Sequence, residues 1–148
     1  MDLTMKTLKA FAVFFISINA NAIEYVKDID NEISYSAREP RECFDISDTR
    51  TINQCIDYFD TESQKSLNEI FANIQGKVTR DIELLNDAQE KWISFRHSEC
   101  KIRSVPGRAF RDPTSQVDLF YRACAAKLNQ DRTEQLNSIT LGCDSCVQ

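Results

Sequence analysis

The segment TINQCIDYFDTESQKSLNEIFANIQGKV, residues 51–78, has the clearest hydrophobic periodicity in the chain. Its apolar side chains recur every three or four residues, which is the spacing of one face of an α-helix. They are Ile52, Cys55, Ile56, Phe59, Leu67, Ile70, Phe71, Ile74 and Val78. Ser47, Asp48 and Thr49 are candidate helix caps, and Gly76 weakens the end of the pattern. We therefore expect one long helix, or two collinear helices, in this segment.

Two further helical patterns follow toward the C-terminus. The first of them has acidic residues near its start and basic residues near its end, as the helix dipole favours, and its apolar stripe is Ile82, Leu85, Ala88, Trp92, Phe95 and Ile102. Pro106-Gly107 breaks this pattern, and Asp112-Pro113 is typical of a new helix start. The face of the last helix comprises Val117, Phe120, Tyr121, Cys124, Leu128, Gln135, Leu136 and Ile139, with Gly142 as its stop.

Three amphipathic helices of this length can bury their apolar stripes against one another. The sequence therefore predicts an all-α fold, in which a helical hairpin stapled by disulfides packs against a third helix. Trp92 and Phe95 lie in the middle of the second stripe, so we expect both to be core residues. Nothing in the chain repeats.

The N-terminus resembles an export signal. Lys6 and Lys9 precede a short apolar run, and Ala20-Asn21-Ala22 follows it, so we expect residues 1–22 to be a signal peptide cleaved after Ala22. No apolar run approaches the roughly 20 residues of a membrane-spanning helix. Residues 23–42 form an acidic N-terminal arm, with a short strand near residues 33–35, and residues 43–148 form the helical domain with its cysteine-containing tail. These predictions place the protein in the periplasm or outside the cell.

The predicted mature chain is acidic. Removing Asp2, Lys6 and Lys9 leaves 16 basic and 22 acidic residues, a net charge of 16 − 22 = −6. This balance disfavours nucleic acid and anionic lipid surfaces as partners, and it suits a cationic protein partner because opposite fields speed encounter. Solubility alone explains the same net charge equally well. The oligomeric state is not readable from the sequence.

All six cysteines lie after the predicted cleavage site: Cys43, Cys55, Cys100, Cys124, Cys143 and Cys146. Disulfides are expected in an oxidising compartment, and six cysteines permit 15 connectivities, among which a sequence does not choose. Local spacing suggests one set. A bridge from Cys43 to Cys55 would fasten the incoming segment to the first helix, and one from Cys100 to Cys124 would join the second helix to the third.

The pair Cys143-Asp-Ser-Cys146 allows three interpretations: a local disulfide, a redox pair or half of a zinc site. We favour the disulfide, because a thioredoxin-like pair starts a helix in an α/β pattern, whereas this pair follows a helix. His97 is the only histidine, and no nucleophile motif accompanies it. We therefore predict no catalytic residues, no metal site and no cofactor. We expect Arg96 and Arg132 to have structural roles, each with a carboxylate or carbonyl partner.

Several short motifs occur together in a specific order. Leu67-Asn68-Glu69 follows Cys55, then come Ala88-Gln89, Trp92-Ile93, Phe95-Arg96 and Cys100, and finally Tyr121-x-x-Cys124 and Arg132-Thr133-x-x-Leu136. As a set, from Cys43 to Leu136, they resemble the LprI-like lysozyme inhibitor family. The resemblance implies an exported, helical protein with the pairings Cys43–Cys55 and Cys100–Cys124, and lysozyme inhibition as its activity. The acidic arm and the Cys143/Cys146 tail depart from the family pattern.

Three functions remain open on these grounds. The first is an exported protein that binds and inhibits a cationic lysozyme. The second is a binding protein for another envelope target, without catalytic activity. The third is a thiol oxidoreductase that uses Cys143 and Cys146. We expect a non-enzymatic role.

Overall fold

The computed structural model describes residues 23–27, 34–78, 80–109 and 111–139 of the 148-residue chain. Three long helices dominate it: α1 (Thr49–Gln75), α2 (Ile82–Arg103) and α3 (Pro113–Asn137). Two short 3-10 helices, η1 (Pro40–Asp45) and η2 (Val105–Ala109), precede α1 and α3. The all-α, disulfide-stapled prediction is confirmed, and the segment after Asp48 forms one continuous helix. The predicted signal peptide, Gly142 and the pair Cys143 and Cys146 lie outside the described residues.

Local chemistry sets the helix boundaries. Among the three predicted capping candidates, Asp48 is the N-cap of α1, and its carboxylate accepts hydrogen bonds from the backbone N–H and the hydroxyl of Thr51, both at 2.8 Å. The backbone hydrogen bond is the main reason why the pKa of Asp48 lies below its ordinary value. Asp112 caps α3, with Pro113 in the first turn as the sequence predicts.

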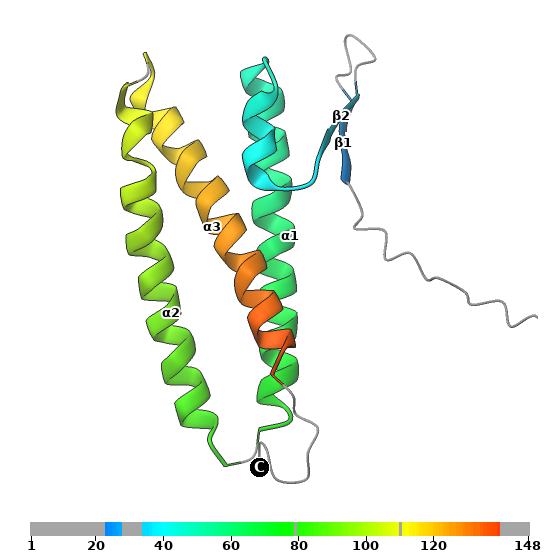
Figure 1. Cartoon of the computed structure of the whole chain (residues 1–148), viewed down its shortest axis with the longest axis vertical. Coiled ribbons are helices and arrows are strands. Elements are labelled where there is room, and N and C mark those ends of the chain that lie inside the picture. The colour runs from blue at the N-terminus through cyan, green and yellow to red at the C-terminus, as the bar shows by residue number, and fades with distance from the viewer. Residues whose placement is uncertain (1–22, 28–33, 79, 110, 140–148) are drawn as a thin grey trace, which may run out of the picture.

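The connection between α2 and α3 depends on Gly107. A Cβ atom added to this residue would lie 2.7 Å from the backbone nitrogen of Val117, so only glycine lets η2 approach α3 this closely. The predicted break at Pro106-Gly107 is therefore confirmed, and it lies within the short helix η2. It returns the chain so that α2 and α3 lie side by side (Figure 1).

The order of the helices differs from a simple hairpin with a third helix added. In Figure 1, α3 runs diagonally between α1 and α2, and it packs along much more of α1 than of α2. α1 and α2 approach each other mainly near their connection, where the Gln75 amide donates to Asn86 at 2.7 Å. Because α3 is covered from two directions, its buried residues do not form a single stripe. Leu119, Ala123, Ala125, Ala126 and Leu136 are all buried, whereas the predicted core residue Ile139 is exposed.

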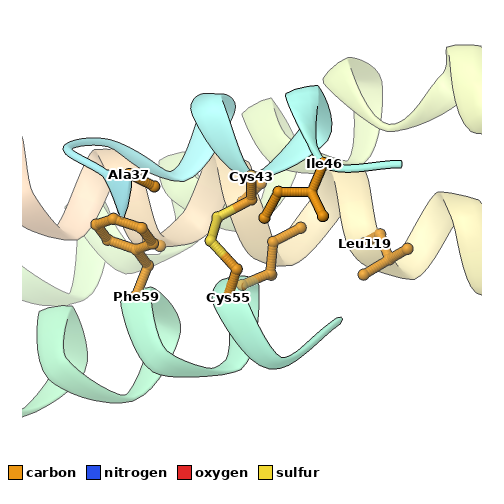
Figure 2. Packing of buried hydrophobic residues seen from close by; sticks show 9 residues of the cluster. Ala37, Cys43, Ile46, Cys55, Phe59 and Leu119 are labelled. Atoms are coloured by element: carbon orange, nitrogen blue, oxygen red, sulfur yellow. A yellow bond between two sulfur atoms is a disulfide. The ribbon is translucent and has the colours of Figure 1, made fainter. Parts of the chain in front are cut away.

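The main apolar core lies between the first half of α1, η1 and α3. Phe59 and Ile56 of α1 and Leu119 of α3 are fully buried there, and the Cys43–Cys55 disulfide passes through the same cluster (Figure 2). A second cluster around Leu67, Ile74 and Leu136 closes the other end of the bundle. The apolar face predicted for residues 51–78 is therefore largely the face that packs against α3.

The arm before Cys43 contains two strands. β1 (Ile23–Lys27) and β2 (Ser34–Ala37) form an antiparallel pair, in which Ile23 lies opposite Ala37 and Glu24 opposite Ser36. The predicted short strand near residues 33–35 overlaps β2, whereas β1 was not predicted. Ala37 is buried in the main core, so the arm is attached to the helical domain at the end of β2. Across the described part of the chain, no helix is both long enough and apolar enough to span a membrane.

Candidate functional site

Trp92 is the centre of the interface between α2 and α3. The guanidinium carbon of Arg96, one turn later on α2, lies 5.3 Å from the centroid of the Trp92 ring, and that of Arg132 on α3 lies 5.7 Å from it. Both distances are within the range of cation–π contacts. Trp92 is half-buried, so the prediction that it is a core residue holds in part. Unlike a typical core residue, it contacts two charged side chains.

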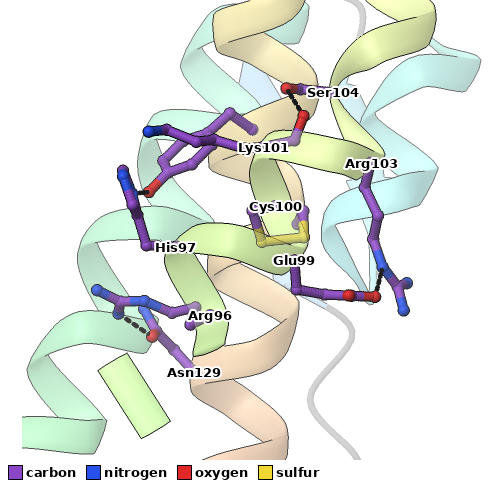
Figure 3. The surroundings of a disulfide bond; sticks show 10 residues. Arg96, His97, Glu99, Cys100, Lys101, Arg103, Ser104 and Asn129 are labelled. Carbon is purple, nitrogen blue, oxygen red and sulfur yellow. Dashed lines mark hydrogen bonds and ion pairs between the residues drawn. A yellow bond between two sulfur atoms is a disulfide. The ribbon is translucent and has the colours of Figure 1, made fainter. Parts of the chain in front are cut away.

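A hydrogen-bonded chain connects this cluster to α1. Arg96 Nη1 donates to the side-chain carbonyl of Asn129, and Asn129 Nδ2 donates to Ser63 Oγ at 3.2 Å (Figure 3 shows the first contact). Asn129 is fully buried, so its amide joins side chains from all three helices. The backbone carbonyl of Asn129 accepts a further bond from the Thr133 hydroxyl at 2.9 Å. A buried amide satisfied in this way specifies one arrangement of the helices.

The two arginines lack carboxylate partners among the described residues. Arg96 has the carbonyl partner predicted from the sequence, but its Nε is buried without a hydrogen bond. Arg132 Nε donates to the Gln89 side-chain oxygen at 3.3 Å, and burial lowers the pKa of Arg132 below its ordinary value. These contacts hold Trp92, Arg96 and Arg132 in place, and they explain why Gln89 is buried on a helix that is otherwise mostly exposed.

The Cys100–Cys124 disulfide fastens the last turns of α2 to α3. Its S–S bond is 2.04 Å long with the Cα atoms 5.5 Å apart, and the Cys43–Cys55 bridge has the same S–S length with 5.8 Å between Cα atoms. Both pairings implied by the resemblance are confirmed. The second bridge also sets the rotation of α2, because Cys100 must face α3.

His97 is paired with Tyr121. His97 Nδ1 lies 2.8 Å from the Tyr121 hydroxyl, and the two rings meet edge to face at 5.8 Å, close to the Cys100–Cys124 bridge (Figure 3). His97 is exposed. A phenol hydroxyl orients the imidazole, whereas nucleophilic catalysis combines a histidine with an activated nucleophile and an acid.

One exposed face of α2 carries a row of apolar side chains. Phe95 is 53% exposed, Leu84 66% and Ile102 64%. The prediction that Phe95 and Ile102 are core residues is therefore wrong, as it is for the exposed Ala88. The reason is the rotation set by Cys100. Arg96 and Trp92 lie four and eight residues before Cys100 and share its face, whereas Phe95, five residues before it, points elsewhere. Leu84, Ala88, Phe95 and Ile102 are called the α2 stripe below.

One shallow groove is hollowed between α1 and α3. It has a volume of about 380 Å³ and is lined by Ser66, Glu69, Ile70, Asn73, Thr133 and Asn137. Within the described ranges, no group of three or more His, Cys, Asp or Glu side chains is placed to hold a metal ion.

The sequence matches one family model, described as "Lysozyme inhibitor LprI", over residues 43–136, which is more than half of the chain. No curated protein and no solved structure matches the chain. The structure gives the residues of the matching motifs a physical meaning. Gln89, Trp92 and Arg96 of α2 meet Arg132 of α3 in the cluster around Trp92.

Proposed function

The chain belongs to the LprI lysozyme inhibitor family, and from this membership we propose that it is an exported envelope protein that binds lysozyme and inhibits it without catalysing a reaction. The family match is the observation that carries the proposal. The two disulfides support export, because such bonds persist in oxidising compartments outside the cytoplasm. We further propose that residues 1–22 are removed on export, which the mass of the protein recovered from the periplasm will test.

A preformed scaffold supports binding. The two bridges and the buried Asn129 amide fix the helices before a partner arrives, so little conformational entropy is lost on association. Such a protein can occupy an enzyme cleft without being reorganised by it. The family motifs mark mainly residues that hold the bundle together, so the motifs do not themselves identify the residues that contact lysozyme.

The charge of the exported chain supports a cationic partner. Of its net charge of −6, a net −3 comes from residues 23–33, where Glu24, Asp28, Asp30 and Glu32 outnumber Lys27. The rest of the chain is close to neutral for its length. Opposite surface fields accelerate encounter, and they are screened over about 10 Å at 0.1 M salt. Binding to lysozyme should therefore weaken as salt is added.

Calorimetric titration of lysozyme with the oxidised exported protein tests this proposal. We expect an affinity that falls between low and physiological salt and that falls when lysozyme is acetylated on its lysines, which removes their charge. Absence of binding at low salt contradicts the proposal. In that case, a pull-down from envelope extract that recovers one other protein would identify the envelope target that the chain binds instead.

Two charge variants show which acids matter. The first replaces Glu24, Asp28, Asp30 and Glu32 by their amides, and the second does the same to Glu69, Glu83, Glu90 and Glu134, which are exposed on the helices. Each variant changes the net charge from −6 to −2. Equal weakening of lysozyme binding means that overall charge steers association, and a larger loss in the first variant assigns the contact to the acidic arm.

A further inference from the structure

The α2 stripe runs nearly the whole length of its helix. Its members lie four, seven and seven residues apart, so at 100° per residue they fall within about 40° of one another. α2 packs on α3 with its other side, through Trp92 and Cys100. Exposed apolar rows of this kind on a helix that is fixed in rotation are typical of protein contact surfaces.

The charges beside the stripe are divided along the helix. Residues 82–90 contain Glu83, Asp87 and Glu90 and no basic residue, whereas residues 91–103 contain Lys91, Arg96, Lys101 and Arg103 and one acid, Glu99. Two ion pairs within the helix neutralise four of these charges, Asp87 with Lys91 at 2.6 Å and Glu99 with Arg103 at 2.7 Å, and Arg96 faces α3. Among the described residues, that leaves Glu83 and Glu90 in the first half and Lys101 in the second half outside an ion pair. The helix dipole accounts for such charges only within the first and last turns. Glu83 and Lys101 lie in those turns, whereas Glu90 lies beyond the first turn of α2, where the dipole does not account for it.

We propose that the α2 stripe docks on the α2 stripe of a second copy of this chain, with the two helices antiparallel. A cationic partner such as lysozyme would be attracted by Glu83 and Glu90 and repelled by Lys101. A second copy in antiparallel orientation brings Glu83 of each copy toward Lys101 of the other. The division of charge therefore selects a second copy over a uniformly cationic partner. This inference does not rest on the proposed lysozyme inhibition.

The spacing of the stripe is compatible with a two-fold axis near residue 93. That axis places Leu84 opposite Ile102 of the second copy and Phe95 opposite Lys91 of the second copy, whose methylene groups can cover the ring. Glu83 then lies beside Lys101 of the second copy. The contact would be a strip one helix wide and about 33 Å long. The area of such a strip is smaller than the roughly 800 Å² that each partner buries in a standard interface, so we expect the dimer to be weak and sensitive to salt.

Sedimentation velocity of the oxidised exported protein tests the contact. The measurement is made at a series of protein concentrations up to about 1 mM, a range that covers weak affinities. We expect a monomer–dimer equilibrium. Phe95→Ala should weaken it about 100-fold, because the substitution removes a buried ring from both copies. Ile93→Ala is the matched control: Ile93 is 44% exposed but lies half a helical rotation from Leu84, so its replacement should leave the equilibrium unchanged.

A charge exchange tests the orientation. Glu83→Lys and Lys101→Glu should each weaken the dimer, and the double variant should restore it. The two residues lie 18 positions apart, about 27 Å along one helix, so restoration can come only through a second copy. A chain that stays monomeric at every concentration overturns the proposal, as does a dimer that Phe95→Ala leaves intact. If Phe95→Ala instead weakens lysozyme binding in a monomeric chain, the stripe belongs to lysozyme and the proposal is wrong.

Discussion

The two sides of α3 are built on different principles. Toward α1, α3 packs through buried apolar side chains such as Leu119 and Ala126, against Ile56 and Phe59. Toward α2, it presents Asn129 and Arg132 to Arg96, Gln89 and Trp92. Apolar packing is roughly additive in buried area and tolerant of detail, whereas a buried polar network stabilises only when its groups are satisfied.

This difference explains the exposure of the α2 stripe. A helix that binds its neighbour through an apolar stripe turns that stripe inward, as α1 does with Phe59. α2 packs Ile82 and Leu85 against the core only near its start, and its later turns are held by Trp92, Arg96 and the Cys100–Cys124 disulfide. A second apolar row is therefore left for the surface. The α1–α3 side therefore stabilises the bundle, and the α2–α3 side determines how α2 is presented.

The largest effect is expected on the apolar side. Phe59→Ala removes a fully buried ring and should lower the free energy of unfolding by about 3–5 kcal/mol. Urea denaturation followed by circular dichroism measures this change. A loss below 1 kcal/mol would mean that the α1–α3 side is not the stabilising core.

Removal of either disulfide comes next. Cys43→Ser with Cys55→Ser, and Cys100→Ser with Cys124→Ser, should each cost about 3 kcal/mol in the chain-entropy description. The two variants differ in a second readout, because only the Cys100–Cys124 bridge sets the rotation of α2. Fluorescence of Trp92, the single tryptophan of the chain, should change in the folded state of the second variant and stay constant in the first.

The polar side should respond to single and paired substitutions in different ways. Asn129→Ala removes the acceptor of Arg96 and the donor to Ser63, and it should cost about 1–3 kcal/mol. Arg96→Met combined with Asn129→Leu removes the charge and the amide together, and it should cost less than Asn129→Ala alone. The same urea experiment measures these costs. If the double variant costs as much as the sum of its two single substitutions, the network is not a unit.

The smallest effect is expected on the α2 stripe. Phe95→Ala replaces the same residue type as Phe59→Ala, but at a position that is 53% exposed, so the stability of the monomer should change by no more than about 0.5 kcal/mol. The measurement belongs at low protein concentration, where self-association does not contribute. A cost comparable to that of Phe59→Ala would place Phe95 in the core after all.

The sequence predicts the helices and both described disulfides because these depend on local patterns and on a specific motif set. The caps at Asp48 and Asp112 and the turn at Gly107 follow from the preferences of single residues. Strand β1 was not predicted, since a short strand is stabilised by its pairing with β2 rather than by its own composition. The predicted face of α2 is confirmed at Ile82, Leu85 and Trp92, which pack against the second core cluster. It is wrong at Ala88, Phe95 and Ile102, because periodicity shows that an apolar row exists, not which neighbour it meets.

A usable signal for that face was present in the sequence. Gln89, Trp92, Arg96 and Cys100 recur at three- and four-residue spacing, which is as helical as the apolar row. Combined with the pairing of Cys100 to Cys124, this spacing places the polar row against α3. The partners Asn129 and Ser63 could not have been assigned in the same way, because nothing local marks a buried amide or hydroxyl.

Lysozyme inhibition remains the central functional claim, and lysis of a peptidoglycan suspension tests it most directly. Lysozyme activity is measured with and without the oxidised exported protein, at low and at physiological salt. We predict dose-dependent inhibition that weakens as salt is added. Unchanged lysis at both salt concentrations, with a chain that is folded and carries its disulfides, would contradict the claim.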